Sequence, residues 1–296
     1  KCSGRLAPAR STQNYAHSLA AKEVRDYAAA LRTGFDRVKA TSLLTNAHIL
    51  EIQATLERNR AGFRRLPGTT LKDTSGRIVY TPPQDATEVA RLMGDLESFI
   101  NEPHRLDADP LVKMAIIHHQ FESIHPFYDG NGRTGRILNV LYLVLSGLLD
   151  IPVLYLSRYI VRTKAEYYRQ LQSVRDGGGW EPWILYMLRA VEITAAGTVR
   201  TIGEIREALQ RYKHFIRDHH RFYSQDLVNN LFRHPYTKID FVVQDLGVSR
   251  LTATRYLDQL TRDGLLAKHK VGRSNYYVNL ALAALLVRTE ADEPRS

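Results

Sequence analysis

Residues 125–136 form a polar, glycine-rich stretch, HPFYDGNGRTGR, that leads directly into the apolar segment ILNVLYLVLSGLL at residues 137–149. The apolar segment is typical of a buried helix, so the polar stretch should form the loop that opens it. The first N–H groups of a helix have no intrahelical partner, the helix dipole favours anions there, and glycine lets the backbone approach a ligand closely. This feature predicts a phosphate-binding site at the start of a helix.

Two side chains of this stretch have roles that follow from their chemistry. His125 is the nearby group whose unperturbed pKa lies close to neutrality, so it is a candidate general base for a hydroxyl group. Asp129 supplies a hard carboxylate oxygen, which suits one position in a Mg²⁺ shell that phosphate oxygens and water complete. These two residues are the candidate catalytic base and the candidate metal ligand.

The remaining residues of the stretch offer donors to an anion. The amides of residues 130–132 can form a concave anion nest, and two arginines three residues apart can both reach a polyphosphate from the first turns of a helix. The residues expected to bind the nucleotide are Gly130, Asn131, Gly132, Arg133, Thr134, Gly135 and Arg136. A base, a metal ligand, an anion nest and two arginines together indicate phosphoryl or nucleotidyl transfer.

Short pieces of this stretch, such as Asp-Gly or Asn-Gly, usually mark turns, but the assembled string is far more specific than its parts. It resembles the motif HPFx(D/E)GNGRxxR of the Fic family at every position. Residues 116–124, IIHHQFESI, also resemble the helix that leads into the family motif, and a looser similarity extends over about residues 20–200. The chain is therefore identified as a member of the Fic family.

The resemblance implies a mainly helical fold that transfers AMP from ATP to a Ser, Thr or Tyr hydroxyl of a target protein. It implies that His125 deprotonates the hydroxyl, that Asp129 holds Mg²⁺, and that pyrophosphate leaves. Asn131 and the loop amides would hold the α-phosphate, and Arg133 and Arg136 the β- and γ-phosphates. The target protein and its modified residue are not indicated by the sequence.

Other chemistry exists within the family. Some members transfer other groups, such as phosphate from ATP in the Doc branch, or phosphocholine, and removal of AMP is a further alternative. A lysine tends to replace the second motif glycine in the Doc branch, so Gly132 favours AMP transfer here.

A second segment fits the same picture. Residues 73–76, DTSG, form a turn signal, and the alternating residues 76–83 that follow predict a short hairpin whose prolines mark it as an edge. The segment resembles the flap that lies over the Fic site and aligns the target by strand addition. We therefore expect the target to contact Arg77, Ile78, Val79 and Tyr80. The alternative is a surface hairpin that packs on helices.

Many Fic proteins carry a helix with the pattern Ser/Thr-x-x-x-Glu-Gly/Asn, whose glutamate pairs with the last arginine of the motif. Residues 1–50 contain no such pattern. The resemblance then implies that Arg136 is unpaired and that ATP can bind productively, unless control is supplied in another way.

Composition limits the class of protein. The chain has 296 residues, 44% of them hydrophobic and 24% charged, which is ordinary globular usage and enough for two modest domains. Its single cysteine, Cys2, rules out a disulfide framework and favours a reducing, cytoplasmic compartment. Residues 1–20 lack the apolar core of a secretory signal, and the apolar stretch 137–153 is too short and too polar to span a membrane, so we expect no membrane partner.

The formal net charge of +10 favours acidic partners, nucleic acid included. Arginine-rich runs at residues 58–65 and 200–221 are expected to be solvated helix faces. His118 and His119 match no zinc-binding spacing, so we expect them to pack within a helix, one facing in and one facing out.

The breaks in periodicity predict a loose segment at residues 1–20, a Fic domain at 21–200, a connecting helix at 201–222 and a second domain at 223–296. Helices are expected at residues 23–38, 45–58, 86–100, 110–121, 157–174 and 180–209. The predicted fold class is mainly α, with a β-hairpin flap and a small α+β C-terminal domain.

The C-terminal domain shows helix, turn, helix and hairpin signals, which resemble a winged helix-turn-helix. Residues that would contact DNA are Arg250, Thr252 and Arg255 on the second helix and Lys270 and Arg273 on the wing. Winged helices also dock proteins, so DNA binding and protein docking both stay open, and the family resemblance makes a homodimer a further expectation.

Overall fold

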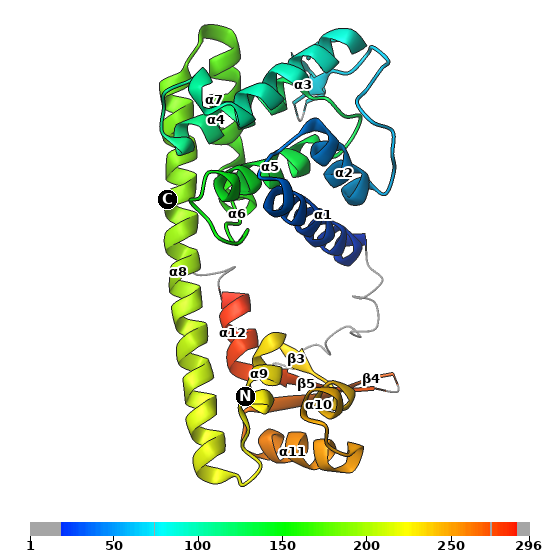
Figure 1. Ribbon diagram of the computed structural model, residues 1–296, viewed down its shortest axis with the longest axis vertical. Coiled ribbons are helices and arrows are strands. Elements are labelled where there is room, and N and C mark those ends of the chain that lie inside the picture. Colours follow the sequence, from blue (N-terminus) through cyan, green and yellow to red (C-terminus); the bar gives the residue numbers. More distant parts are fainter. Residues whose placement is uncertain (1–18, 74, 273, 289–296) are drawn as a thin grey trace, which may run out of the picture. The chain divides into compact units, whose positions relative to one another are not determined.

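The computed structural model describes residues 19–73, 75–272 and 274–288 (Figure 1). The predicted loose segment at residues 1–20 therefore lies almost wholly outside the described residues. The chain divides into two compact units, and the boundary between Ala195 and Ala196 falls inside one helix, α8 (Trp180–His219). The described residues are mainly helical with small antiparallel sheets, which confirms the predicted fold class.

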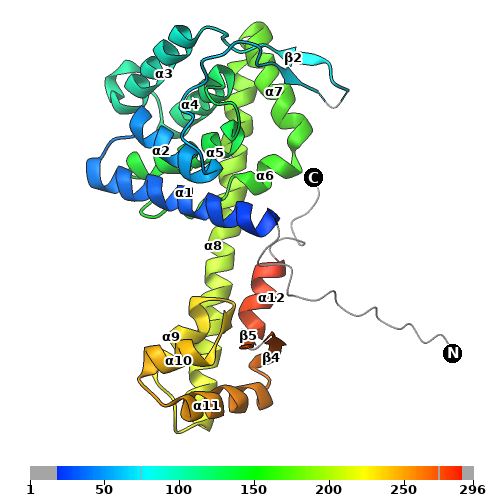
Figure 2. The ribbon, with the colours of Figure 1, turned by 90° about the vertical axis from the view of Figure 1, so that its right-hand side faces the viewer.

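Long helices and one short hairpin build the first unit (Figure 2). Its elements before the motif are α1 (Leu19–Thr41), α2 (Asn46–Glu57), β1 (Leu71–Lys72), β2 (Ile78–Tyr80), α3 (Ala86–Asn101) and the short 3₁₀ turn η2 (Pro103–Arg105). They are followed by α4 (Pro110–Ile124), α5 (Asn131–Leu145), α6 (Ser157–Arg162), α7 (Lys164–Gly177) and the first part of α8.

Local signals in the sequence set the starts of these helices. The Thr45 hydroxyl accepts a hydrogen bond from the His48 N–H at the start of α2, and the Asp85 carboxylate accepts one from the Glu88 N–H at the start of α3. Asp109 caps α4 in the same way, and Pro110 occupies its first position, where no N–H is needed. These caps explain why the predicted helix starts agree closely with the structure.

The apolar core of the first unit lies around α4 and α5, which pack against each other, and α1 packs on both α2 and α5. Ile117, Phe121, Ile137 and Leu141 are all fully buried there. Gly34 on α1 lies so close to α5 that a Cβ at this position would overlap the Leu141 side chain. Close helix packing therefore fixes α5, and with it the loop that opens it.

Several helix boundaries differ from the prediction. The stretch 157–174 divides into α6 and α7 at Thr163, α8 continues to His219 instead of ending at residue 209, and α5 ends at Leu145, so the apolar stretch 137–153 is only partly helical. The run 58–65 is not a helix, because α2 ends at Glu57. Neither Gly nor Pro marks the break at Thr163 or the expected end at residue 209, whereas Gly147, with φ 76°, lies just beyond the end of α5.

The second unit contains the rest of α8, α9 (Gln225–Arg233), β3 (Tyr236–Thr237), α10 (Ile239–Leu246), α11 (Arg250–Arg262), β4 (Leu266–Val271), β5 (Ser274–Asn279) and α12 (Leu280–Arg288). Its antiparallel sheet has the order β3-β5-β4, with Leu266 opposite Asn279 in the β4–β5 hairpin. The Ser249 hydroxyl accepts a hydrogen bond from the Thr252 N–H and caps α11. A separate core, which includes Val242, Leu257 and Tyr277, holds this unit together.

Among the described residues, no helix has both the length and the apolar character needed to cross a membrane.

Candidate functional site

The predicted catalytic loop connects the end of α4 to the start of α5. His125 lies directly after α4 in a left-handed conformation with φ 49°, and its N–H donates a hydrogen bond to the Phe121 carbonyl oxygen. Positive φ is uncommon for a residue other than glycine, so the surrounding contacts must hold it. The turn at His125 ends α4 and begins the loop that leads to α5.

The Asn131 side chain closes this loop. Its Oδ1 accepts a hydrogen bond of 2.9 Å from the Phe127 N–H, and its Nδ2 donates one of 2.8 Å to the Phe127 carbonyl oxygen. Both residues are buried. The amide side chain therefore shapes the loop, and the main-chain N–H groups at the start of α5 are left to face an anion.

Arg64 holds the loop from outside the motif, although it was not among the residues predicted for the site. It is 1% exposed, and its Nε donates a hydrogen bond of 2.8 Å to the His125 carbonyl oxygen. The same guanidinium group donates to the carbonyl oxygens of Ile124 and Pro83. The expectation that the run 58–65 is a solvated helix face is therefore wrong for Arg64, which is a buried cation that ties three carbonyl groups together.

Burial and two nearby cations determine the charge of His125. Burial, Arg64 and Arg175 together lower the pKa of His125 to about 4. The imidazole is therefore neutral near pH 7, the form that can accept a proton. Its Nδ1 is buried and has no hydrogen-bond partner among the described residues.

Each of the three motif glycines lies against a specific neighbour. Gly130 has φ 81°, and a Cβ there would lie 2.5 Å from the Glu57 Oε1. A Cβ on Gly132 would lie 3.2 Å from the Arg136 Nη1, and one on Gly135 would lie 2.8 Å from the Glu122 Oε1. Glycine is therefore favoured at Gly130 by its positive φ, and side chains at Gly132 and Gly135 would displace the ends of Arg136 and Glu122.

The two motif arginines have different surroundings. Carboxylates surround Arg133: Glu23 at 2.6 Å, Glu57 at 2.8 Å and Asp129 at 3.8 Å. Arg136, in contrast, has a buried Nε without a hydrogen-bond partner among the described residues. Arg136, which the sequence predicted to be unpaired, therefore has a nitrogen without a hydrogen-bond partner among the described residues. Arg133, in contrast, is already in contact with carboxylates.

Thr134 and Asp129 complete the motif. Thr134 is fully buried, and its hydroxyl group has no hydrogen-bond partner among the described residues. The Asp129 side chain is 79% exposed, and its Oδ1 accepts a hydrogen bond of 2.7 Å from the Gly130 N–H. No cluster of three or more acidic, histidine or cysteine side chains suited to a metal occurs in the part of the chain that the structure describes. One exposed carboxylate fits a Mg²⁺ ion that a nucleotide's phosphates and water would mainly hold.

The predicted flap is a hairpin of β1 and β2, and its residues divide into two groups. Ile78 and Val79 are 54% and 41% exposed, and Arg77 pairs with the Asp73 carboxylate across the turn. Tyr80 is anchored instead, because the Arg175 guanidinium lies 3.8 Å from its ring centre and its hydroxyl donates to the Ser123 carbonyl oxygen. Ile78, Val79 and the Arg77 side chain, which is 79% exposed, are therefore the residues of the flap that are open to a target.

A cavity of about 840 Å³ lies between the motif, the flap and α7. His125, Gly132 and Val79 line it, and so do seven residues of α7 that were not predicted, namely Lys164, Ala165, Tyr168, Arg169, Leu171, Gln172 and Arg175. Four of these follow the spacing i, i+4, i+8 and i+11 of one helix face, which is the signal that could have identified them. The volume of the cavity suits a ligand of nucleotide dimensions.

His118 and His119 both pack inside the first unit, with exposures of 1% and 4%. The expectation that one of them faces out is wrong, because Trp180 and Trp183 of α8 cover the side of α4 that would otherwise face solvent. His118 bonds to the Tyr167 hydroxyl at 2.9 Å. The packing role predicted for these histidines agrees with these contacts.

The residues predicted to contact DNA lie on α11 and β4 of the second unit. Arg250 pairs with Asp240, the Thr252 hydroxyl bonds to the Ser249 hydroxyl, and Arg255 lies over the Tyr256 ring. Lys270 is exposed on β4, and Arg273 lies outside the described residues.

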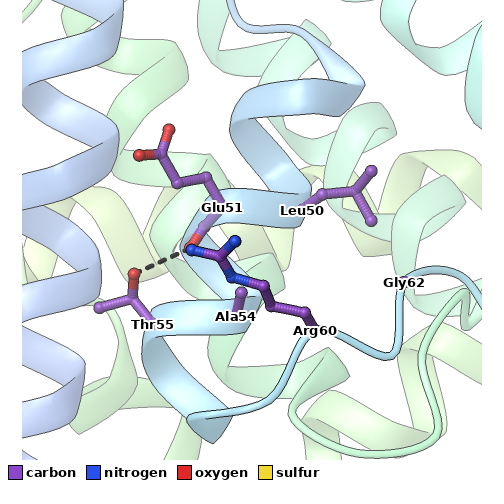
Figure 3. Close-up of a pocket in the computed structure, with 6 residues that line it drawn as sticks. All are labelled: Leu50, Glu51, Ala54, Thr55, Arg60 and Gly62. Atoms are coloured by element: carbon purple, nitrogen blue, oxygen red, sulfur yellow. Dashed lines mark hydrogen bonds between the residues drawn. The ribbon is translucent and has the colours of Figure 1, made fainter.

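A second, more open pocket of about 520 Å³ lies beside α2 (Figure 3). The residues that line it are Leu50, Glu51, Ala54, Thr55, Arg60 and Gly62. It contains none of the residues predicted for catalysis or nucleotide binding, so the cavity beside His125 is the candidate site.

Comparison with known proteins agrees with this geometry. Residues 43–143 match the model of the Fic/DOC family, and residues 209–282 match the model of the C-terminal domain of SoFic-like protein adenylyltransferases. The chain is 32% identical over 173 residues to protein adenylyltransferase fic-1 of Caenorhabditis elegans, which covers 56% of this chain and 31% of the relative. It is 29% identical over 211 residues to fic-1 of Caenorhabditis briggsae, covering 69% of this chain and 37% of the relative.

The chain thus spans about a third of the length of these two curated relatives. Among solved structures, a Fic family protein from Desulfovibrio desulfuricans has the same fold, with a TM-score of 0.51 and 22% identity over 87% of this chain and 74% of that one. The chain therefore contains a Fic/DOC family domain that includes the His125 loop, and a SoFic-like C-terminal domain.

Proposed function

We propose that the chain is a protein adenylyltransferase, which transfers AMP from ATP to a hydroxyl group of a target protein. The observation that carries this proposal is the placement of a neutral, half-buried His125 beside the N-terminus of α5 and a cavity of about 840 Å³. The curated relatives are also named protein adenylyltransferases.

In the proposed reaction, the His125 imidazole accepts the proton of a Ser, Thr or Tyr hydroxyl, and the oxygen attacks the α-phosphorus of ATP. The hydroxyl oxygen becomes bonded to the α-phosphorus, so the target carries AMP through a phosphodiester. The bond from the α-phosphorus to the oxygen that bridges the α- and β-phosphates breaks, and pyrophosphate leaves. The N–H groups at the start of α5, with Arg133 and Arg136, stabilise the phosphate charge. When bound at Asp129, Mg²⁺ would neutralise part of that charge.

The target would bind along the flap. Ile78 and Val79 are exposed, and the flap is held over the site because Tyr80 is anchored to Arg175 and Ser123. An extended segment of the target can add to this edge by main-chain hydrogen bonds, which present its hydroxyl to His125.

Incubation with Mg²⁺ and ATP labelled at either the α- or the γ-phosphate tests this proposal. We expect protein-bound label from α-labelled ATP alone, and its loss by at least a hundredfold in His125→Ala, since general-base catalysis contributes about 10²–10⁴-fold. Label from the γ position would establish phosphate transfer in its place. No protein-bound label from either, with the chain folded and lysate proteins present, would contradict the proposal.

For the second unit we propose a winged-helix module that docks a protein. Two of its basic side chains already have acidic partners, because Arg250 pairs with Asp240 and Lys268 with Asp258, and Leu251, next to Arg250 in the chain, is 82% exposed. A cation that is already paired gains less from a phosphate contact, so this pattern favours a protein partner over DNA. Binding to duplex DNA that weakens steeply with salt and survives His125→Ala would overturn this choice.

A further inference from the structure

Glu122 is a buried acid that the proposed reaction does not use. It lies on the last turn of α4, three residues before His125, is 7% exposed and lines the cavity. Its Oε1 has no hydrogen-bond partner among the described residues. A buried carboxyl oxygen without a partner is costly, so its retention beside a ligand cavity requires an explanation.

The Glu122 carboxyl group faces the expected phosphate site. A Cβ on Gly132 would lie 3.8 Å from the Glu122 Oε1 and 3.2 Å from the Arg136 Nη1, so both side chains border the first turn of α5. Arg136 also has an unpartnered Nε. An acid and a guanidinium group, each with a buried atom that lacks a hydrogen-bond partner among the described residues, therefore lie beside the backbone that would hold the phosphates.

Titratable or charged side chains surround the Glu122 carboxyl group, and each element that packs against Glu122 contributes some of them. These titratable or charged groups are His118 on α4, His125 in the loop, Arg136 on α5, and Lys164, Tyr167, Tyr168, Arg169 and Arg175 on α7. Burial raises the pKa of Glu122 to about 7, against the attraction of Arg136 and Arg175. Burial lowers the pKa values of His118 and His125 to about 3 and 4, so both are neutral near pH 7. The charge of the Glu122 carboxyl group can therefore change near neutrality.

An anion at the start of α5 changes this balance. A triphosphate brings negative charge next to the carboxylate and competes with it for Arg136, and both effects favour the neutral acid. We propose that Glu122 is a positioning residue of the nucleotide site, which takes up a proton when the triphosphate binds and so leaves Arg136 to the phosphates. The proton comes from solvent and bonds to a carboxyl oxygen. This inference rests on the proposed ATP site.

Calorimetric titration with Mg·ATP tests it in the His125→Ala background, which prevents turnover. Titrations in two buffers of different ionisation enthalpy count the protons taken up. Above about pH 7 each unit of pH should weaken binding by up to about tenfold, so the Kd should rise on the order of tenfold between pH 7.0 and 8.5. In Glu122→Gln this proton uptake and this rise should disappear.

Two further variants separate positioning from a structural effect. Glu122→Asp keeps the carboxyl group, so it should retain the proton uptake even if it binds Mg·ATP with a larger Kd. Glu192→Gln on α8 removes an exposed acid, 66% accessible, and should behave like the parent. Equal proton uptake in the parent and in Glu122→Gln would overturn the inference, and so would its absence from the parent.

The outcomes also separate this inference from the proposed function. If the unaltered chain transfers AMP but Mg·ATP binding shows no proton uptake that depends on Glu122, the inference alone fails. If Mg·ATP does not bind and no label is transferred, both fail.

Discussion

At the scale of single residues, Arg64 and His125 show how one buried cation shapes a catalytic group. The Arg64 guanidinium donates to the His125 carbonyl oxygen, which holds the left-handed turn, and its charge helps to keep the imidazole neutral. A general base at this position must be neutral to accept a proton. Arg64 thus contributes to both the geometry and the protonation state of His125.

Arg64→Met should lower the free energy of unfolding by about 2–3 kcal/mol, because three carbonyl groups lose a charged donor in a buried place. Urea denaturation followed by circular dichroism measures the change. The neighbouring variant Arg65→Met provides the control, because Arg65 is exposed and its change should stay within about 0.5 kcal/mol. Equal effects of the two variants would contradict the role assigned to Arg64.

At the scale of elements, α4 brings together four titratable groups whose pKa values move in opposite directions. Burial lowers the pKa of His118 to about 3 and that of His119 to about 4. It also lowers the pKa of His125, at the end of the helix, to about 4. Burial raises the pKa of Glu122 to about 7. All four groups are therefore neutral in the folded chain at mildly acid pH.

This arrangement makes stability depend on pH. Between pH 6.5 and 5 the three histidines take up protons in the unfolded chain but not in the folded one, so the free energy of unfolding should fall as the pH falls. Glu122 acts in the opposite direction, since between pH 7 and 4.5 it binds a proton in the folded chain and not in the unfolded one.

Three histidines outweigh one glutamate, so the unfolding temperature should decrease from pH 6.5 to 5. In Glu122→Gln the opposing contribution is lost and the decrease should be steeper. Thermal unfolding in a pH series measures both slopes. A constant or rising unfolding temperature over this window would show that the histidines are not held neutral.

At the scale of the whole chain, the two units have separate cores. Ile117 belongs to the core around α4 and α5, and Leu257 belongs to the core between α11 and the sheet of the second unit. Both side chains are fully buried. Units with independent cores can unfold independently, even though α8 contributes residues to each.

Differential scanning calorimetry should therefore resolve two transitions. Ile117→Ala should lower the temperature of one transition and Leu257→Ala that of the other, each through a loss of about 2–5 kcal/mol from a buried cavity. A single transition that both variants shift together would show that the chain unfolds as one cooperative unit.

The sequence alone determined the features that depend on neighbours along the chain. The motif at residues 125–136 indicated a phosphate site, the periodic patterns located the starts of α3, α4, α6 and α8, and the predicted fold class is confirmed. Such signals are local, because a cap or an anion nest is formed by residues within a few positions of each other.

Only the tertiary structure decided what depends on distant residues. Arg64 lies 61 positions from the carbonyl group it contacts, α7 supplies the far wall of the cavity, and α8 covers His119. The same holds for Glu122, whose charge depends on Arg136 and Arg175. Burial and ion pairing arise from packing between elements, so they shift pKa values and engage arginines in ways that spacing along the chain does not reveal.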